Sequence, residues 1–217
     1  GIGQHFYVLI SQDPKKRQGF EEDWLSVNLP LTYGYLIQFK DVLIKRAAYQ
    51  KYFYKEVKKN GKVIDRQPIA PFYSMYNINE ESFARYRVAW KRMASKMSAS
   101  VLGNVKTPFG TKRVISTDTT SFMTAGSAEE AHYLCAILNS DVIDDYIRSF
   151  SSGGRGFGAP SVMKNLSIPL FDLKNKLHSQ LAELSEQAHH DVQISKDIDK
   201  IEEQINETTR KLWNIKS

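Results

Sequence analysis

The chain has 217 residues, of which 41% are hydrophobic, 12% aromatic and 25% charged. This is the composition of a globular protein large enough for one domain and an appendage. No apolar run approaches the roughly 20 residues of a membrane-spanning helix and no signal peptide opens the chain, so we expect no membrane partner. A single cysteine, Cys135, excludes an internal disulfide and favours a cytoplasmic location.

Charge is distributed unevenly along the chain. Residues 1–120 contain 20 Lys and Arg against 10 Asp and Glu, whereas residues 121–217 contain 10 against 14. An excess of positive charge in one part of a chain suggests a polyanionic partner for that part, such as nucleic acid. The alternative is a solvated surface that is merely rich in lysine.

In the first third of the chain, residues 5–10 predict a strand and residues 33–40 predict either a strand or the start of a helix. Apolar residues at helical spacing predict a helix over 41–60. Asn60-Gly61 is a turn signal, and residues 62–64 then predict a strand.

The middle of the chain predicts a mixed, strand-rich region. A short helix capped by Asn79 or Glu80 is expected to run to Phe83. Alternating residues and turn signals then predict strands at 85–90, 99–105, 112–116 and 122–124.

Helices dominate the last third. Ser127 is a plausible N-cap for a helix over 128–150, with Glu130 as its capping-box partner, and a break is expected near Asn139. From residue 175 onward an apolar heptad stripe appears, with a phase slip at 189–193. It comprises Leu177, Leu181, Leu184 and Ala188, then Ile194, Ile198, Ile201, Ile205, Thr208, Leu212 and Ile215.

This stripe has two interpretations. It belongs either to helices packed on their own domain or to an arm that docks on another domain or subunit, and its residues form either one helix or two. The sequence therefore predicts an α+β fold in which a strand-rich domain, 1–172, precedes a C-terminal helical arm, 173–217.

A glycine-rich run, 151–158, precedes a short apolar strand predicted to end at Ile168-Pro169-Leu170. The run fits neither a P-loop nor a dinucleotide-binding fingerprint. It is a structural loop, a small-molecule loop, or a DNA-contact loop containing Ser152, with Arg155 as the charged reader and Phe157 as an apolar or stacking contact. Arg suits the DNA alternative because its guanidinium can bond phosphate or guanine in two places.

Paired cations provide the other candidate DNA contacts. Lys91-Arg92 and Lys112-Arg113 lie at predicted strand ends, where we expect them to bind phosphates. Trp90, beside the first pair, is more typical of a core residue than of a stacking platform. No metal-ligand cluster, nucleophile or carboxylate pair stands out, so we expect no catalytic residues and no metal site in this chain.

Four segments, taken in order, resemble one known family. They are Val88–Met93, Tyr133–Ser140, Ser149–Gly158 and Leu166–Pro169. Together they resemble the C-terminal target-recognition (TaqI-like specificity) domain of adenine-specific DNA methyltransferases in restriction–modification systems. Their order is also similar to that in the specificity subunits of type I restriction enzymes. The resemblance covers 66–217 well, and the first 65 residues only in general character.

The resemblance implies a module that reads a short sequence in double-stranded DNA and delivers it to a methyltransferase domain earlier in the same parent chain. That domain would bind S-adenosylmethionine and flip the target adenine, with or without an associated endonuclease. The catalytic signature of the family contains Pro-Pro, which is absent here, so this chain is expected to be non-catalytic alone and to hold no cofactor. The rival hypothesis is a protein-interaction or scaffold module that works through its heptad helices.

Overall fold

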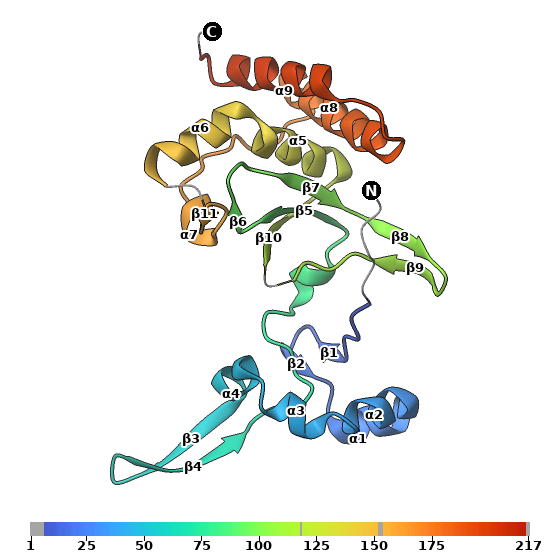
Figure 1. The fold of residues 1–217 in the computed structure, drawn as a ribbon, viewed down its shortest axis with the longest axis vertical. Coiled ribbons are helices and arrows are strands. Elements are labelled where there is room, and N and C mark those ends of the chain that lie inside the picture. The colour runs from blue at the N-terminus through green and yellow to red at the C-terminus, as the bar shows by residue number, and fades with distance from the viewer. Residues whose placement is uncertain (1–6, 118, 152–153, 216–217) are drawn as a thin grey trace. The chain divides into compact units, whose positions relative to one another are not determined.

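The computed structural model describes residues 7–117, 119–151 and 154–215, and it has the predicted α+β fold (Figure 1). The chain divides into two compact units, Gly1–Ser82 and Phe83–Ser217. This boundary differs from the one predicted between residues 172 and 173, because the C-terminal helices pack on the preceding helices within the second unit.

The first unit is built from short elements around a small aromatic core. Its helices are α1 (Glu22–Asn28), α2 (Pro30–Ile37), α3 (Lys40–Ile44) and α4 (Ala47–Tyr52). Its strands are β1 (Gln12–Asp13), β2 (Gln18–Gly19), β3 (Tyr54–Lys59) and β4 (Lys62–Pro68), paired β1 with β2 and β3 with β4. The core contains Leu25, Leu36, Tyr49, Phe53, Phe72 and Tyr73.

Residues 33–40 are mainly helical, which is one of the two alternatives predicted for them. Two expectations for this unit need correction. Residues 7–10, the described part of the predicted strand at 5–10, form no strand. The helix predicted over 41–60 ends at Tyr52. The physical reason for that early end is the Asn60-Gly61 turn, in which both residues have positive φ (52° and 76°). Such a turn matches the twist of two antiparallel strands, so it recruits 54–59 as the partner of β4.

The division between the units falls within η1 (Glu80–Phe83), the predicted short helix, whose Ser82 N–H donates to Asn79 Oδ1 (3.1 Å). The second unit contains the larger sheet. Its central sheet is antiparallel, in the order β10-β5-β7. A β8–β9 hairpin and a short β6–β11 pair flank it. The strands are β5 (Tyr86–Lys91), β6 (Met93–Ala94), β7 (Ala99–Leu102), β8 (Asn104–Thr107), β9 (Gly110–Arg113), β10 (Thr120–Ala125) and β11 (Gly154–Arg155).

Helices cover one face of this sheet, α5 directly and α8 and α9 beyond it (Figure 1). They are α5 (Ala128–Asn139), α6 (Asp141–Phe150), α7 (Pro160–Met163), α8 (Lys176–Gln193) and α9 (Asp199–Leu212). The capping-box prediction is confirmed in part. Ser127 Oγ accepts from Glu130 N–H (3.1 Å), while the Glu130 carboxylate accepts from Gly126 N–H (2.6 Å), one residue before the cap.

The heptad segment forms two helices, α8 and α9, rather than one. Ser195, in the connection between them, has a positive φ of 58°. Leu181, Leu184, Ile201 and Ile205 are buried in the core of the second unit. The stripe therefore packs on its own domain. The strand predicted at 168–170 is instead irregular.

Cys135 is confirmed as a buried residue of this core. Burial raises the pKa of its thiol to about 11, which keeps it protonated and unreactive at neutral pH. Within the described part of the chain, no helix combines the length and the apolar character that crossing a bilayer requires.

Candidate nucleic-acid interface

Lys91 and Arg92 lie where the central strand of the sheet leaves the core. Four consecutive β5 residues, 87–90, are buried, and Lys91 is the first exposed one. Arg92 is half-buried. Its Nε donates to Ser121 Oγ (3.0 Å) and its backbone N–H to Thr119 O (3.1 Å). The backbone that carries this cation pair is therefore fixed by the sheet.

Gly158 attaches the glycine-rich loop to this strand end. Its N–H donates to Arg92 O (3.0 Å), and its carbonyl accepts from the indole N–H of Trp90 (2.8 Å). A Cβ atom at residue 158 would lie 2.2 Å from Lys91 O and 2.8 Å from Trp90 Cδ1. Only glycine allows this approach, and the prediction that Trp90 is a core residue is confirmed.

The loop pairs with the chain a second time through β6 and β11. Arg155 is opposite Met93 in this antiparallel pair, and Gly156 follows with φ +91°. The backbone of Arg155 thus lies beside the residue that follows Arg92. Ser152 and the side chain of Arg155 lie outside what the structure describes. Of the predicted contacts, Lys91, Arg92 and the backbone of Arg155 are the ones brought together.

Phe157 requires a correction. Its side chain is 0% exposed and belongs to the core of the second unit. The guanidinium of Arg148 covers its ring, 5.4 Å from the centroid. A base cannot stack on this ring without unfolding the loop, so Phe157 anchors the loop from inside.

Arg148 and Asp144, which sequence reasoning missed, fix the segment after Arg92. Asp144 accepts from Arg148 Nε (2.6 Å) and from Met97 N–H (2.8 Å), and Arg148 also donates to Ser95 O. The i,i+4 spacing of this acid–base pair on a helix is a signal that could have found it. Residues 91–97 consequently form a ledge held by α6, β10 and the glycine loop.

Lys112 and Arg113 lie elsewhere, on the exposed strand β9. Arg113 donates to Phe83 O, and Arg87 donates to Val114 O (2.8 Å), so this pair lies near the beginning of β5. Burial, and secondarily Arg113, lower the pKa of Arg87. Five residues of strand separate Arg87 from Arg92, which is about 17 Å at roughly 3.3 Å per residue. The two predicted cation pairs therefore form two sites rather than one.

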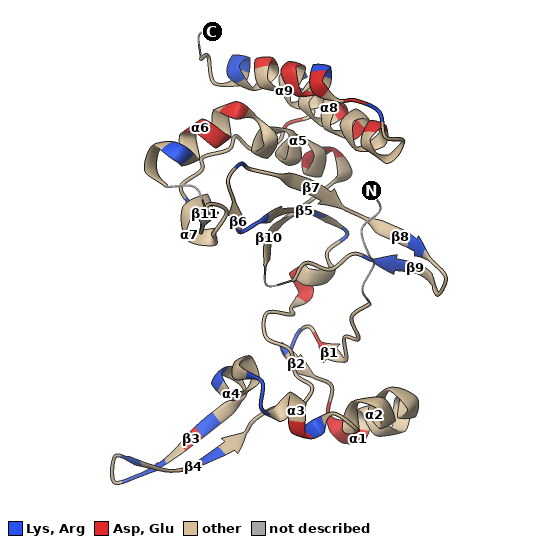
Figure 2. Cartoon of the chain, viewed as in Figure 1, with Lys and Arg blue, Asp and Glu red and all other residues tan. Residues whose placement is uncertain are grey.

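In the second unit, the balance of basic and acidic residues differs between the strands and the helices. Residues 83–120, which form most of the sheet, contain eight Lys and Arg and one Asp, whereas the remainder of the unit is acidic on balance. Figure 2 shows basic residues and no acidic ones on β5, β8 and β9, whereas α5, α6, α8 and α9 carry most of the acidic residues together with a smaller number of basic ones. A polyanion would be attracted to the strands and repelled by the helices.

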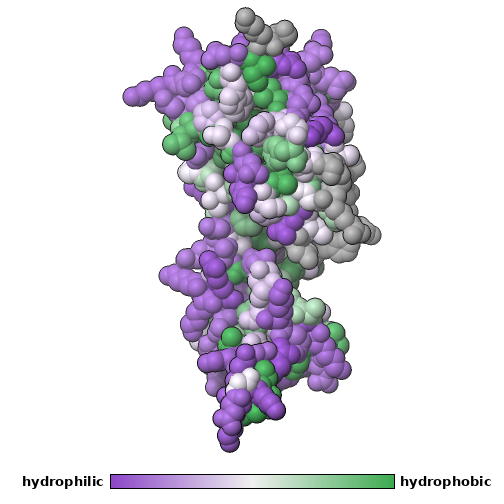
Figure 3. All heavy atoms as spheres, turned by 90° about the vertical axis from the view of Figure 1, so that its left-hand side faces the viewer, coloured by the Kyte–Doolittle hydropathy of each residue, from purple (hydrophilic) through white to green (hydrophobic). Residues whose placement is uncertain are grey.

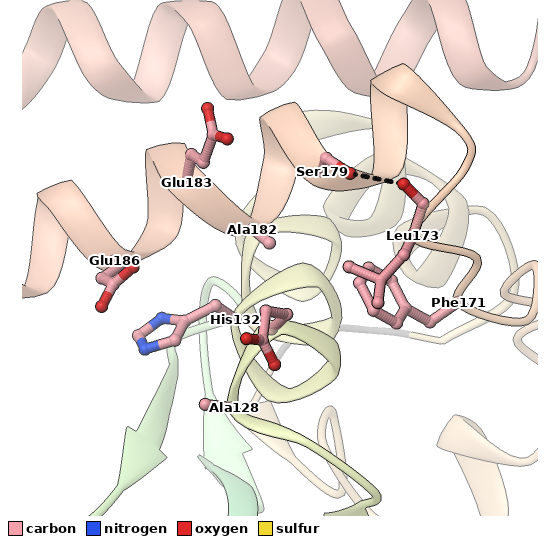
Figure 4. Close-up of a pocket in the computed structure, with 9 residues that line it drawn as sticks. Ala128, His132, Phe171, Leu173, Ser179, Ala182, Glu183 and Glu186 are labelled. Atoms are coloured by element: carbon pink, nitrogen blue, oxygen red, sulfur yellow. Dashed lines mark hydrogen bonds between the residues drawn. The ribbon is translucent and has the colours of Figure 1, made fainter.

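A hollow between α5, α8 and residues 171–173 provides a contrasting surface (Figure 4). Three carboxylates line it, those of Glu129, Glu183 and Glu186, together with His132. Burial, and secondarily the nearby His189, lower the pKa of His132, so it is neutral at pH 7. This hollow would repel phosphate, and no group of three or more His, Cys, Asp or Glu residues in the described ranges is arranged to hold a metal.

Comparisons with known proteins assign no family to this chain, so its function is inferred from its own residues. No protein-family model matches the sequence, and no curated protein matches it at a significant level.

Proposed function

We propose that this chain is the sequence-specific DNA recognition module of a restriction–modification N6-adenine DNA methyltransferase. In this proposal it acts in the cytoplasm and delivers double-stranded DNA to an upstream domain of the parent chain, which supplies S-adenosylmethionine chemistry. The observation that carries the proposal is the ledge at residues 91–97, where exposed and half-buried cations lie beside the backbone of the glycine loop.

The fixed backbone of this ledge favours recognition of a specific DNA sequence over non-specific electrostatic attraction to DNA. The backbone of Arg92 is fixed by hydrogen bonds with Gly158 and Thr119, and that of Met97 by Asp144, before any ligand arrives, so little conformational freedom is lost on binding. Phosphate contacts of this kind set the register of a protein on a duplex, and side chains nearby then read bases. Arg155, next to the ledge, would be the reader.

The second cation pair extends the contact. Lys112 is exposed near the other end of β5, and a separation of about 17 Å corresponds to roughly five phosphates along one DNA strand. Two phosphate clamps near opposite ends of β5, one at Lys91 and one at Lys112 on β9, would hold a short recognition site between them. The rival scaffold function has less surface available, because most of the heptad residues that it requires pack in the core of their own unit, although Ile194 and Ile215 are exposed.

Binding of a fluorescent 30-base-pair duplex at several salt concentrations tests the proposal. A Lys91→Gln/Lys112→Gln variant should lower the slope of log K against log salt by about 1.8, because each neutralised phosphate contributes about 0.9. The control, Lys174→Gln/Lys200→Gln, removes the same charge from exposed positions outside the basic sheet and should leave the slope unchanged. Absence of binding by the unaltered chain at low salt would refute the proposal.

The Arg155→Ala variant separates base recognition by Arg155 from phosphate binding by the two cation pairs. If Arg155 reads bases, the variant should lose preference among duplexes selected from a random pool and keep most of its non-specific affinity. A neutral result would assign the loop a purely architectural role.

A further inference from the structure

The β3–β4 hairpin is the most exposed regular element of the first unit. Asn60-Gly61 connects its strands, which pair with each other and with no other described strand. Every residue of β4 is exposed, and in β3 only Tyr54 and Val57 are partly covered. An isolated two-stranded ribbon gains little from burial, so a ribbon kept in this state is expected to serve a partner.

The hairpin carries the whole positive excess of its unit (Figure 2). Residues 54–68 contain five Lys and Arg against two Asp and Glu. The remainder of residues 1–82 contains seven of each, and is neutral on balance. Figure 3 shows mainly hydrophilic side chains over the part of the surface where β3 and β4 lie.

Strand alternation divides the charges between two faces. On one face the charges are already paired within the protein. Lys58 lies 3.3 Å from Glu56, and Arg66 donates to Gln50 O (2.6 Å) while its guanidinium lies over the Tyr54 ring, 5.2 Å from the centroid. The cations of this face are therefore already engaged within the unit.

The other face contains Lys55, Lys59 and Lys62, which we call the lysine face, together with Asp65, whose carboxylate accepts from Arg66 N–H (2.7 Å) and Gln67 Nε2 (3.0 Å). Within the ranges that the structure describes, none of these lysines has a carboxylate at ion-pair distance. Lys59 and Lys62 are directly opposite each other across the turn. Like charges at opposed positions destabilise a strand pair, and a bound polyanion would remove that repulsion.

The base of the hairpin is anchored while its far end is free. Tyr54 packs edge-on against buried Tyr49, with ring centroids 5.5 Å apart, and Ile69 N–H donates to Phe53 O (2.9 Å). Beyond Tyr54 the strands extend about 17 Å, at roughly 3.4 Å per residue. The ribbon is therefore held at one end and exposed on both faces along the rest of its length.

We propose that this ribbon enters the major groove of duplex DNA, with the lysine face toward the phosphates that border the groove. The inference rests on the proposed function and adds a second DNA-binding element to it. The major groove is about 12 Å wide and admits a two-stranded ribbon, whose strands lie about 4.8 Å apart. Val63 and Ile64, both exposed beyond the turn, supply apolar contacts of the kind that thymine methyl groups accept.

A charge-matched comparison tests the ribbon. In a Lys55→Gln/Lys59→Gln/Lys62→Gln variant the salt slope for duplex DNA should fall by about 2.7, so that wild type loses roughly 40-fold more affinity than the variant between 50 and 200 mM salt. Lys174→Gln/Lys176→Gln/Lys200→Gln removes three exposed lysines from the second unit and should change nothing. The triple Lys→Arg variant of the lysine face should restore wild-type binding.

Groove and partner class are tested on the unaltered chain. Duplex DNA with glucosylated 5-hydroxymethylcytosine, whose sugars fill the major groove, should bind more weakly, and netropsin in the minor groove should have no comparable effect. Duplex RNA of the same sequence should bind more weakly, because its deep, narrow major groove excludes the ribbon.

Failures of the two proposals are distinguishable. Wild-type affinity and slope in the lysine-face variant would overturn the ribbon alone, as would equal affinity for glucosylated DNA. Binding of vesicles of anionic phospholipid by wild type, lost in the variant while DNA binding is kept, would identify the ribbon as a membrane contact instead. Absence of DNA binding by wild type would remove both proposals.

Discussion

Gly158→Ala is the sharpest test of how the glycine loop is built. The added methyl carbon would lie 2.2 Å from the carbonyl oxygen of Lys91 and 2.8 Å from Trp90 Cδ1. The first neighbour is backbone in the sheet and the second is a buried ring, so neither can give way easily. The loop itself must therefore move away from β5.

The cost follows from what that movement breaks. Two hydrogen bonds would be lost, Gly158 N–H to Arg92 O (3.0 Å) and Trp90 Nε1–H to Gly158 O (2.8 Å). Each contributes about 1 kcal/mol, and a buried indole N–H left without an acceptor adds roughly 1 more. We expect the free energy of unfolding to fall by about 3 kcal/mol, or roughly 10 °C in the melting temperature of the second unit.

Urea unfolding followed by tryptophan fluorescence measures this loss, and duplex binding measured in parallel should weaken because the loop leaves the Lys91–Arg92 ledge. Gly103→Ala is the matched control, since residue 103 has open space around the Cβ position and no positive φ, and it should be neutral or slightly stabilising. A Gly158→Ala protein within about 0.5 kcal/mol of wild type would refute this account of the loop.

Two further changes probe the helical layer. Burial lowers the pKa of both His132 and His178 below the usual 6.5, so the unfolded chain binds more protons below about pH 6.5 and stability should fall with pH, by at most about 1.4 kcal/mol per pH unit for each histidine. Urea unfolding at several pH values between 7.5 and 5.5 measures this change in stability. The His178→Gln variant should show a weaker dependence of stability on pH. Wild-type stability that does not change over this range would contradict the prediction. Ser127→Ala removes the acceptor of Glu130 N–H (3.1 Å) and should cost about 1 kcal/mol in thermal unfolding. Ser127→Asp should retain the cap, and equal stability of all three proteins would show that the cap contributes nothing.

Local signals predicted the elements whose chemistry is complete within a few residues. The Ser127 cap and the Asn60-Gly61 turn both depend on neighbours close in the chain, and both are present in the structure. The helix predicted over 41–60 was wrong from Tyr54 onward, because apolar spacing in a basic segment did not reveal that a downstream strand pairs with it.

Site residues were harder to predict, because exposure is a tertiary property. Phe157 looked like an available ring in a glycine loop, yet Arg148 and the core enclose it. Arg87 lies in the basic part of the sequence, yet it is 1% exposed and donates to Val114 O. Conversely, the lysine face arises only once pairing register assigns Lys59 and Lys62 to opposed positions. Composition showed that the first half of the chain is basic, and only the fold showed which cations remain available.

The salt dependence of DNA binding can separate the two candidate surfaces. If only Lys91 and Lys112 bind phosphates, the slope of log K against log salt should be about −1.8, and if only the lysine face does, it should be about −2.7. One duplex that contacts both surfaces should give a slope of about −4.5. The last value implies a loss of roughly 500-fold in affinity between 50 and 200 mM salt, against about 12-fold for the Lys91 and Lys112 sites alone. If one duplex contacts both surfaces, the slope reductions of the two sets of variants should add in the combined variant. If each unit binds a separate duplex, either set of variants should leave the binding of one duplex intact, and the stoichiometry of wild type should be two duplexes per chain.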